Sequence, residues 1–408
     1  MASTASKKKP RKERNTPLSH PPSQDSSFLS AFSPSADLFA IVSLAVDKHR
    51  LRIHDTHTGK SISEYIVDSA RVTALSWATL SSPNALLDGQ ETNDSTPRKK
   101  RKKRDSRVLQ PVSDPDAIPV VVLGLSTGSV ILFSSSHARV IRTLSHPSSS
   151  SPVLSVDVYS DVPRTAQKIL TLGADGFIRT WNAQTGELLS STKTDDRLRG
   201  TSLSLRPGVE SGHPSFLLAH HSIRLLSVSS DSLLTSPQKL TEEARFIGHA
   251  SDIKMLRWQP FDDSHSPQRF ATVAESDRLA HIWEVPRVSG SEGKLVATAP
   301  LDSDARHIAF SQSPSHPSLL VLSASGRIAI FTATNDQGTT VTSKKTKEKV
   351  TTLSPRSSAT ISFKRGMTVQ VINAAFEQEG RIRVAWLAGG VRPVFDVVVS
   401  FSGLYASL

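Results

Sequence analysis

The sequence contains no cysteine among its 408 residues. This absence excludes disulfide bonds, zinc sites built on thiolates and cysteine nucleophiles, and it favours a reducing, intracellular compartment. Long apolar runs are missing as well, since no stretch reaches the roughly 18 apolar residues that a membrane helix needs. The basic residues near the N-terminus are not followed by the apolar segment of a secretory signal. We therefore expect a soluble protein that stays inside the cell and has no membrane contact.

The short motifs of common active sites are also absent. The phrase GLSTGS from Gly124 lacks the Gly-Lys-Ser/Thr ending of a phosphate loop and opens onto an expected strand. No Gly-x-Ser-x-Gly nucleophile elbow occurs. His220 and His221 are adjacent on an expected strand, where successive side chains point to opposite faces, so we do not expect them to share a metal ion. Asp262, Asp263 and His265 form only a weak candidate for a cation. The sequence predicts no catalytic residue, no metal, no cofactor and no small-molecule substrate.

Aromatic residues are few, at 6%, but positive charge is abundant, with a net charge of +12. Two short tracts account for all of it. Residues 7–14 (KKKPRKER) carry a net charge of +5 and residues 98–104 (RKKRKKR) carry +7, which leaves 36 basic and 36 acidic residues elsewhere. This distribution argues against a broad electropositive binding face on the folded body, although a local patch is compatible with it.

The chain repeats one pattern at the period of propeller blades. The clearest copy, KILTLGADGFIRTWNAQTGELLSS from Lys168, has an apolar strand, an Asp-Gly turn, a second strand ending near Trp181, and a Thr-Gly turn. Asp-Gly between two such strands is a strong hairpin signal. Equivalent positions of later copies lie 45 to 57 residues apart, slightly more than the roughly 40–45 residues of a WD repeat. These landmark positions are His54, Phe133, Trp181, Leu226, Trp283 and Phe331.

Each copy is preceded by a short segment that fits the innermost strand of a blade. The segments begin near residues 28, 72, 153, 200, 252, 307 and 368. Counting them predicts an all-β WD-repeat β-propeller of seven blades over residues 27–408. Residues 1–26 are expected to be a disordered basic tail, residues 81–116 a disordered basic insertion, and residues 335–358 a polar loop insertion in the sixth blade. How the ring closes is left open, because the seventh copy leaves little chain for an outer strand.

Several residues are expected to have structural roles in the propeller. The two tryptophans are expected to pack between neighbouring blades rather than to stack on a ligand. His249 is expected to join a hydrogen-bond network within a blade rather than a catalytic one, with Asp252 a nearby candidate partner. The predicted structural residues are Asp175, Gly176, Trp181, Gly248, His249 and Trp283.

The order of motifs resembles one family more than WD-repeat proteins in general. AFSP, an apolar strand, RIHDTHTGK and VTALSWA are followed by the basic insert and then by VVLGLSTGSVILFS. This order is similar to the N-terminal propeller of the WD-repeat nucleolar factors in the t-Utp (UtpA) subcomplex of the small-subunit processome. The resemblance covers roughly residues 28–408 and is strongest over 31–134. Such factors carry a helical C-terminal domain after the propeller. The sequence stops at Leu408, so either the gene product is truncated or this protein has lost a docking element.

The resemblance implies a non-catalytic scaffold in small-subunit processome assembly that supports early pre-18S rRNA processing and rDNA transcription in the nucleolus. Implied partners are sister t-Utp (UtpA) proteins and the 5′ leader of pre-rRNA. The alternative is a generic nuclear WD-repeat adaptor in a chromatin or ubiquitin-ligase complex. An enzyme, such as a propeller hydrolase, would need acidic or histidine side chains that converge on the central channel.

The two basic tracts are interpreted as nuclear import signals that bind an import receptor, with contact to RNA phosphates as a second role. Neither tract contains aromatic residues, so any RNA contact is expected to be salt-sensitive and independent of base sequence. A solvated charge block is the alternative. The residues concerned are Lys7, Lys8, Lys9, Arg11, Lys12, Arg14, Arg98, Lys99, Lys100, Arg101, Lys102, Lys103 and Arg104.

Overall fold

The computed structural model gives an all-β protein in the residues that it describes. Within these residues no helix is long and apolar enough to cross a membrane. The expected tail at 1–26 and the expected insertion at 81–116 lie outside them. The described ranges are 29–45, 48–68, 70–80, 118–145, 150–159, 167–194, 200–207, 215–228, 240–260, 267–275, 277–311, 318–332, 339–342, 349–360, 369–377, 381–388 and 392–398.

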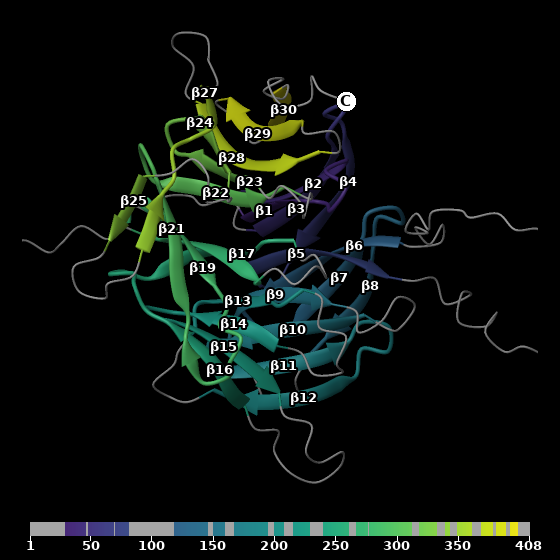
Figure 1. The fold of residues 1–408 in the computed structure, drawn as a ribbon. Helices are drawn as coiled ribbons and strands as arrows, with labels where there is room; N and C mark the ends of the chain where they lie inside the picture. Colours follow the sequence, from purple (N-terminus) through teal and green to yellow (C-terminus); the bar gives the residue numbers. More distant parts are fainter. Residues whose placement is uncertain are drawn as a thin grey trace, which may run out of the picture.

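Seven small antiparallel sheets follow one another along the chain, each forming one blade of a propeller (Figure 1). Blade 1 is built from β1 (Leu29–Phe32), β2 (Leu38–Ala45), β3 (Lys48–Asp55) and β4 (Ser61–Val67). Blade 2 is built from β5 (Val72–Leu80), β6 (Ile118–Leu125), β7 (Val130–Ser134) and β8 (Arg139–Leu144). Blade 3 is built from β9 (Val153–Tyr159), β10 (Lys168–Gly173), β11 (Phe177–Asn182) and β12 (Leu188–Lys193).

The remaining blades repeat this order with additions at the outer edge. Blade 4 comprises β13 (Ser202–Leu205), β14 (Ser215–Ala219), β15 (Ile223–Val228) and β16 (Leu240–Phe246), with β20 (Ser291–Glu292) added in parallel. Blade 5 comprises β17 (Ile253–Trp258), β18 (Arg269–Ala274), β19 (Leu279–Glu284) and β21 (Lys294–Pro300). Blade 6 comprises β22 (Ala305–Phe310), β23 (Ser318–Ser323), β24 (Arg327–Thr332) and β27 (Ser357–Thr360). Blade 7 has three described strands, β28 (Val369–Phe376), β29 (Ile382–Ala388) and β30 (Pro393–Val398).

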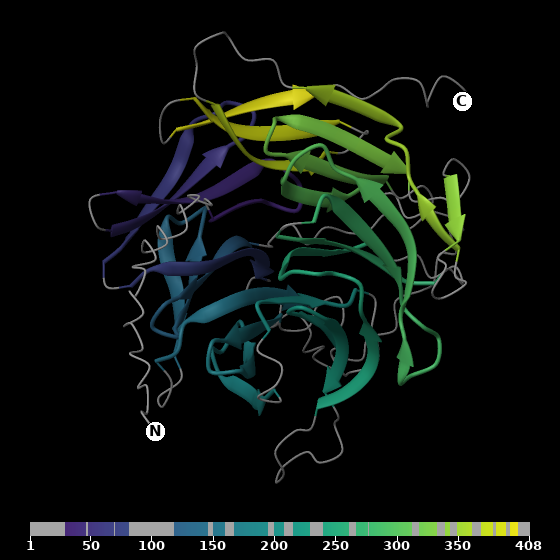
Figure 2. The same ribbon diagram turned by 90° about the vertical axis from the view of Figure 1, so that its left-hand side faces the viewer.

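The first strand of every blade lies at the centre of the ring. These strands contact one another in a closed cycle, in the order β1, β5, β9, β13, β17, β22, β28 and back to β1. In Figure 2 the colours accordingly run round the ring in sequence order, and the yellow last blade lies beside the purple first one. The seven inner strands coincide with the seven segments predicted from the sequence, so the seven-bladed propeller is confirmed.

The second strands are buried on both faces because each blade is sandwiched between two neighbours. In β6 the run from Val120 to Leu123 is fully shielded from solvent. Continuous apolar runs of this kind are expected where both faces of a strand are covered, whereas the outer strands alternate between apolar and polar residues. The landmark side chains of the third strands are buried in the same way, from Phe133 to Phe331. The core is therefore a series of apolar layers between adjacent blades.

Among the described strands, none is exchanged between the first and last blades of the ring. All four strands of blade 1 come from the N-terminal end of the described chain, and the three strands of blade 7 come from its C-terminal end. The two blades share an apolar layer in which Phe39 packs on Phe395, with ring centroids 5.3 Å apart. The other members of this layer are Phe32, Ile41, Ile372, Ala385 and Leu387.

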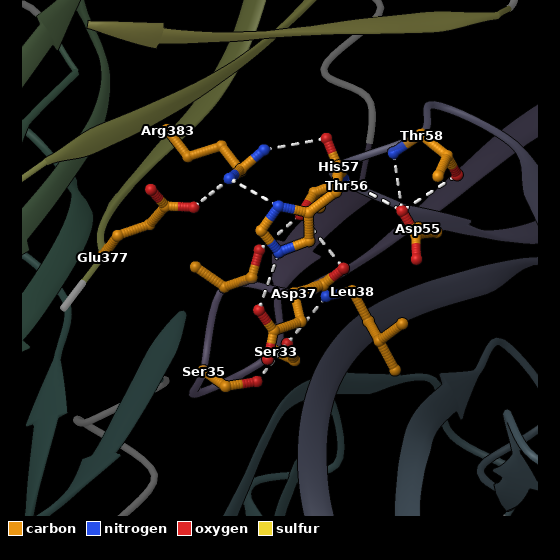
Figure 3. A network of polar contacts seen from close by, with 11 residues as sticks. Ser33, Ser35, Asp37, Leu38, Asp55, Thr56, His57, Thr58, Glu377 and Arg383 are labelled. Carbon is orange, nitrogen blue, oxygen red and sulfur yellow. Dashed lines mark hydrogen bonds and ion pairs between the residues drawn. The ribbon is translucent and has the colours of Figure 1, made fainter. Parts of the chain in front are cut away.

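A polar network completes the closure on the face where first strands lead into second strands (Figure 3). Arg383 of β29 donates a hydrogen bond to the carbonyl oxygen of Thr56 (2.8 Å) and another to Nδ1 of His57 (3.2 Å). The opposite ring nitrogen of His57 then donates to Asp37 Oδ1 (3.0 Å). Glu377 pairs with the guanidinium group of Arg383 from within blade 7. This chain of contacts ties blade 7 to two loops of blade 1.

The segment 335–358, expected as a polar loop, contains regular structure. It holds β25 (Thr339–Thr342) and β26 (Lys349–Thr352), a hairpin whose second strand pairs in parallel with β21 of blade 5. Its last two residues begin β27, the outer strand of blade 6. Both strands are rich in Thr and Val, which are β-branched residues that favour strands. The prediction of a loop was wrong because it relied on the polar composition of the segment and not on the strand propensity of its Thr and Val residues.

We expect Arg383→Ala to weaken ring closure strongly. The substitution removes two contacts across the closure and leaves the carboxylate of Glu377 without its cation in a largely buried position. Breaking such a pair costs about 3 kcal/mol of unfolding free energy. Arg50→Ala is the matched control, since Arg50 pairs with Glu64 within blade 1 at a more exposed site, and we expect it to cost less than about 1 kcal/mol. Equal losses in urea unfolding of the two variants would contradict the closure role of Arg383.

Candidate functional site

The thirteen basic residues predicted for import or RNA contact all lie outside the described residues. For the tract at residues 98–104, the structure does define the two flanking strands. The tract falls between the end of β5 at Leu80 and the start of β6 at Ile118, which are the first and second strands of blade 2. First strands of all blades run in the same direction, so Leu80 and Ile118 lie on the face that carries the closure network. We call this the insert face, and the opposite one, formed by the connections between second and third strands, the turn face.

The predicted residues of blade 5 form one continuous hydrogen-bonded chain. Trp283 Nε1 donates to the hydroxyl oxygen of Thr272 (2.8 Å), and that hydroxyl lies 2.7 Å from Nε2 of His249. Nδ1 of His249 lies 2.6 Å from a carboxylate oxygen of Asp277. The chain is satisfied throughout when His249 is neutral, with its proton on Nδ1 facing the carboxylate and Nε2 accepting from Thr272. The expected network is present, but its acid is Asp277 rather than Asp252.

Burial sets the protonation state of this network. The side chain of His249 is 1% exposed, and burial lowers its pKa, although the hydrogen bond and charge of Asp277 act in the opposite direction. His281 stacks on His249 with ring centroids 4.2 Å apart, and burial together with the neighbouring histidine lowers its pKa to about 4. Gly248 lies against the indole ring of Trp283, where an added Cβ atom would come within 2.7 Å of the ring. These contacts hold the segment before β17, which contains Gly248 and His249, against β18 and β19 of blade 5.

Blade 3 contains a shorter version of the same arrangement. Trp181 Nε1 donates to the hydroxyl oxygen of Thr171 (3.1 Å). Gly176 has a positive φ of 78°, as a tight turn between β10 and β11 requires. Asp175 accepts a hydrogen bond from the backbone of Phe177 (3.1 Å) and pairs with Arg179 (2.5 Å). The structure thus places Asp175, Gly176 and Trp181 in turn and packing positions, and brings none of them to a ligand site.

The central channel brings three ionisable side chains together from separate blades. Asp157 lies on β9, Arg257 on β17 and His307 on β22. Asp157 accepts hydrogen bonds from the backbone N–H groups of Leu205 (2.9 Å) and Val158 (2.9 Å). Burial raises its pKa, while those bonds and the charge of Arg257 oppose the shift. Burial, aided by the same guanidinium, lowers the pKa of His307 to about 3.

Among the channel residues, Asp157 joins two blades. Each carboxylate oxygen of Asp157 accepts a hydrogen bond from a backbone N–H group, and one of these groups, that of Leu205, belongs to the inner strand of blade 4. A histidine with a pKa of about 3 is a weak base, because general bases work best with a pKa near the operating pH. The channel gathers charged side chains from separate blades, and no hydroxyl group forms a hydrogen bond with His307 among the described residues.

The expectation that His220 and His221 point to opposite faces is wrong. Strand β14 ends at Ala219, so both histidines lie in the turn before β15, where the alternation of a strand no longer applies. Their rings approach to 4.1 Å between centroids. Asp252, which precedes β17 of blade 5, lies 3.0 Å from His221 through its Oδ1 atom. The alternative cation candidates Asp262, Asp263 and His265 lie outside the described residues.

Sequence reasoning missed the channel residues and the partners of His249. Asp157 and Arg257 had a usable signal, because each is a charged residue within a segment otherwise suited to an inner strand. Asp277 and Thr272 had none, since a serine-rich and threonine-rich chain offers many equivalent candidates. Their roles depend on which strands become neighbours.

We expect Thr272→Val to destabilise the protein by about 1–3 kcal/mol, because it leaves the Trp283 N–H and a buried histidine nitrogen without their common partner. Thr171→Val in blade 3 is the matched control, since it has no histidine partner. Chemical unfolding of both variants measures the difference. A Thr272→Val protein as stable as the wild type would show that the network contributes nothing.

Stability should fall in mild acid partly through His281. Above pH 6.5 this histidine is neutral in both the folded and the unfolded chain. Between that pH and its folded pKa of about 4, only the unfolded chain takes up the proton, which costs the folded state about 2 kcal/mol at pH 5. His281→Gln should therefore lose less stability than the wild type between pH 7.5 and pH 5. The exposed His137→Gln variant should behave like the wild type, and an unchanged profile for His281→Gln would refute the assignment.

The comparisons with known proteins add no family to this description. Neither a protein-family model nor a curated protein sequence matches the chain. The geometry of the described residues and the distribution of charge in the sequence therefore carry the functional argument.

Proposed function

We propose that this protein is a non-catalytic nuclear scaffold of the small-subunit processome, in which the propeller docks to sister t-Utp (UtpA) proteins. The basic tracts would serve nuclear import and make sequence-independent contacts with the 5′ leader of pre-rRNA. In this role the protein supports early pre-18S rRNA processing and rDNA transcription in the nucleolus. The proposal combines the family resemblance of the sequence with the properties of the ring described above.

The concentration of basic residues in two short tracts is the observation that carries the proposal. The two tracts hold the whole net charge of +12, and the second one is attached to the insert face of blade 2. A polycationic tract attached to a propeller suits phosphate contact by the tract and protein contact by the propeller. Affinity then arises from several weak sites that are tethered together.

The rim of the propeller offers surface of the kind that protein partners use. Outer strands of blades 1, 2 and 3 expose large apolar side chains, and so does the last described strand of blade 7. These four blades are consecutive around the ring. In the described residues β30 pairs only with β29. The exposed side chains are Ile62, Ile66, Ile141, Leu189, Val394 and Val397.

A non-catalytic role agrees with the use of polar groups inside the ring. The buried networks around His249, Asp157 and Arg383 consist of hydrogen bonds and ion pairs that join strands or blades. Because the polar groups inside the ring hold strands and blades together, we assign partner binding to the outer surfaces of the propeller.

We expect deletion of residues 98–104 to weaken nucleolar accumulation and recovery of 5′ leader RNA without unfolding the propeller. The matched control exchanges every Lys and Arg within 98–104, which keeps the charge of +7 but changes the order of residues. Because counterion release depends on charge rather than sequence, this control should retain RNA recovery, and recovery should fall steeply with salt. Fluorescence imaging and crosslinking with RNA sequencing measure the two effects.

Affinity purification of the full chain tests the proposed assembly. Co-purification of t-Utp (UtpA) proteins is the expected result. Recovery of histones or of ubiquitin-ligase subunits in their place would instead identify the protein as an adaptor in another nuclear complex. Unchanged nucleolar localisation of the 98–104 deletion would remove the role assigned to that tract.

A further inference from the structure

The seam between blades 4 and 5 on the turn face gathers three potential metal ligands. His220 and His221 come from the turn between β14 and β15, and Asp252 comes from the residue before β17. One ligand atom of each side chain lies within 4.8 Å of the other two. No other group of three or more such side chains with this spacing occurs in the described part of the chain.

The backbone holds the two contributing segments in place. The N–H group of Ile253 donates to the carbonyl oxygen of His220 (3.4 Å), which links the turn directly to the start of β17. The carbonyl oxygen of Asp252 accepts from the N–H group of Glu275 (2.8 Å), within blade 5. The three side chains are therefore attached to main chain that other contacts already fix, which lowers the entropy cost of bringing them together around an ion.

One carboxylate oxygen of Asp252 is buried without a hydrogen bond. This atom, Oδ1, is shielded from solvent and makes no hydrogen bond of acceptable geometry. The same atom lies 3.0 Å from Nδ1 of His221 and 4.0 Å from Nε2 of His220. A shielded carboxylate oxygen whose nearest polar neighbours are two imidazole nitrogens, neither in hydrogen-bond geometry, would be satisfied by a cation placed between the three groups.

We propose that His220, His221 and Asp252 bind one divalent transition-metal ion of the zinc class. Two imidazole nitrogens and one carboxylate oxygen are ligands that Zn²⁺ accepts at bond lengths of about 2.0–2.2 Å. Ligand atoms around a tetrahedral ion of that size are about 3.3 Å apart, so small side-chain rotations suffice to close the site. The side chains of His220, His221 and Asp252 are 33%, 66% and 46% exposed, which leaves the outer side open for a fourth ligand. The ion would join blade 4 to blade 5.

This site differs from the other histidine cluster in the ring. His249 and Asp277 are committed to the hydrogen-bonded chain of blade 5, and His281 stacks on His249. An ion at the seam would bind the folded chain preferentially, since its ligands come from two blades, and would therefore stabilise the protein by mass action.

Isothermal titration of Zn²⁺ into the untagged full chain, freed of metal by a chelator, tests the proposal. We expect saturable binding of one ion that is weakened at least about tenfold in His220→Ala, His221→Ala or Asp252→Asn, and a thermal transition raised by Zn²⁺ only in the wild type. His137→Ala is the matched control, because His137 is exposed and contacts only serines among the described residues. Ion binding of equal affinity in the wild type and a triple variant would overturn the proposal, as would the absence of saturable binding.

A measurement on the wild-type chain makes the test independent of variant folding. Diethylpyrocarbonate modifies accessible histidines, and mass spectrometry locates the modified residues. Zn²⁺ should protect His220 and His221 from modification and leave His137 reactive. Equal reactivity of His220 and His221 with and without Zn²⁺ would overturn the assignment of these ligands.

Discussion

Burial on both faces of every blade is the constraint on which the structure depends. A sheet whose two faces are apolar is stable only with a neighbour on each side, and a row of such sheets satisfies this at both ends only by closing into a ring. The contact between blade 7 and blade 1 therefore stabilises the whole propeller and not only two blades. Phe39 and Phe395 supply the apolar part of that contact, and Arg383 with His57 supplies the polar part.

Ring formation creates a second constraint at the centre, where seven inner strands each have one edge without a neighbouring strand. Side chains of adjacent blades satisfy part of these edges. Asp157 caps a backbone N–H group of β13, Trp77 donates to the carbonyl oxygen of Ala31, and Asn373 donates to that of Ser30. Unpaired backbone groups are costly when buried, so these polar residues belong in a largely apolar ring. This role accounts for the hydrogen bonds that these residues form between adjacent blades.

The features on which the proposed functions rest lie on different surfaces of the ring. The insert face carries the closure network and the attachment of the basic tract, and the rim exposes apolar side chains on consecutive blades. The turn face carries the His220, His221 and Asp252 cluster. Docking of proteins, contact with phosphates and binding of an ion can therefore take place without competition for the same residues.

The sequence by itself determined the fold class, the seven inner strands, the landmark positions such as Trp283, and the restriction of net charge to two tracts. These features are local, because strand periodicity, turn residues and charge runs are properties of short segments. Only the tertiary structure decided that Asp277 rather than Asp252 meets His249, that His220 and His221 share a turn, and that Arg383 closes the ring onto Thr56 and His57. Each of these depends on which distant segments the ring brings together, and on where a strand ends, which local patterns do not specify.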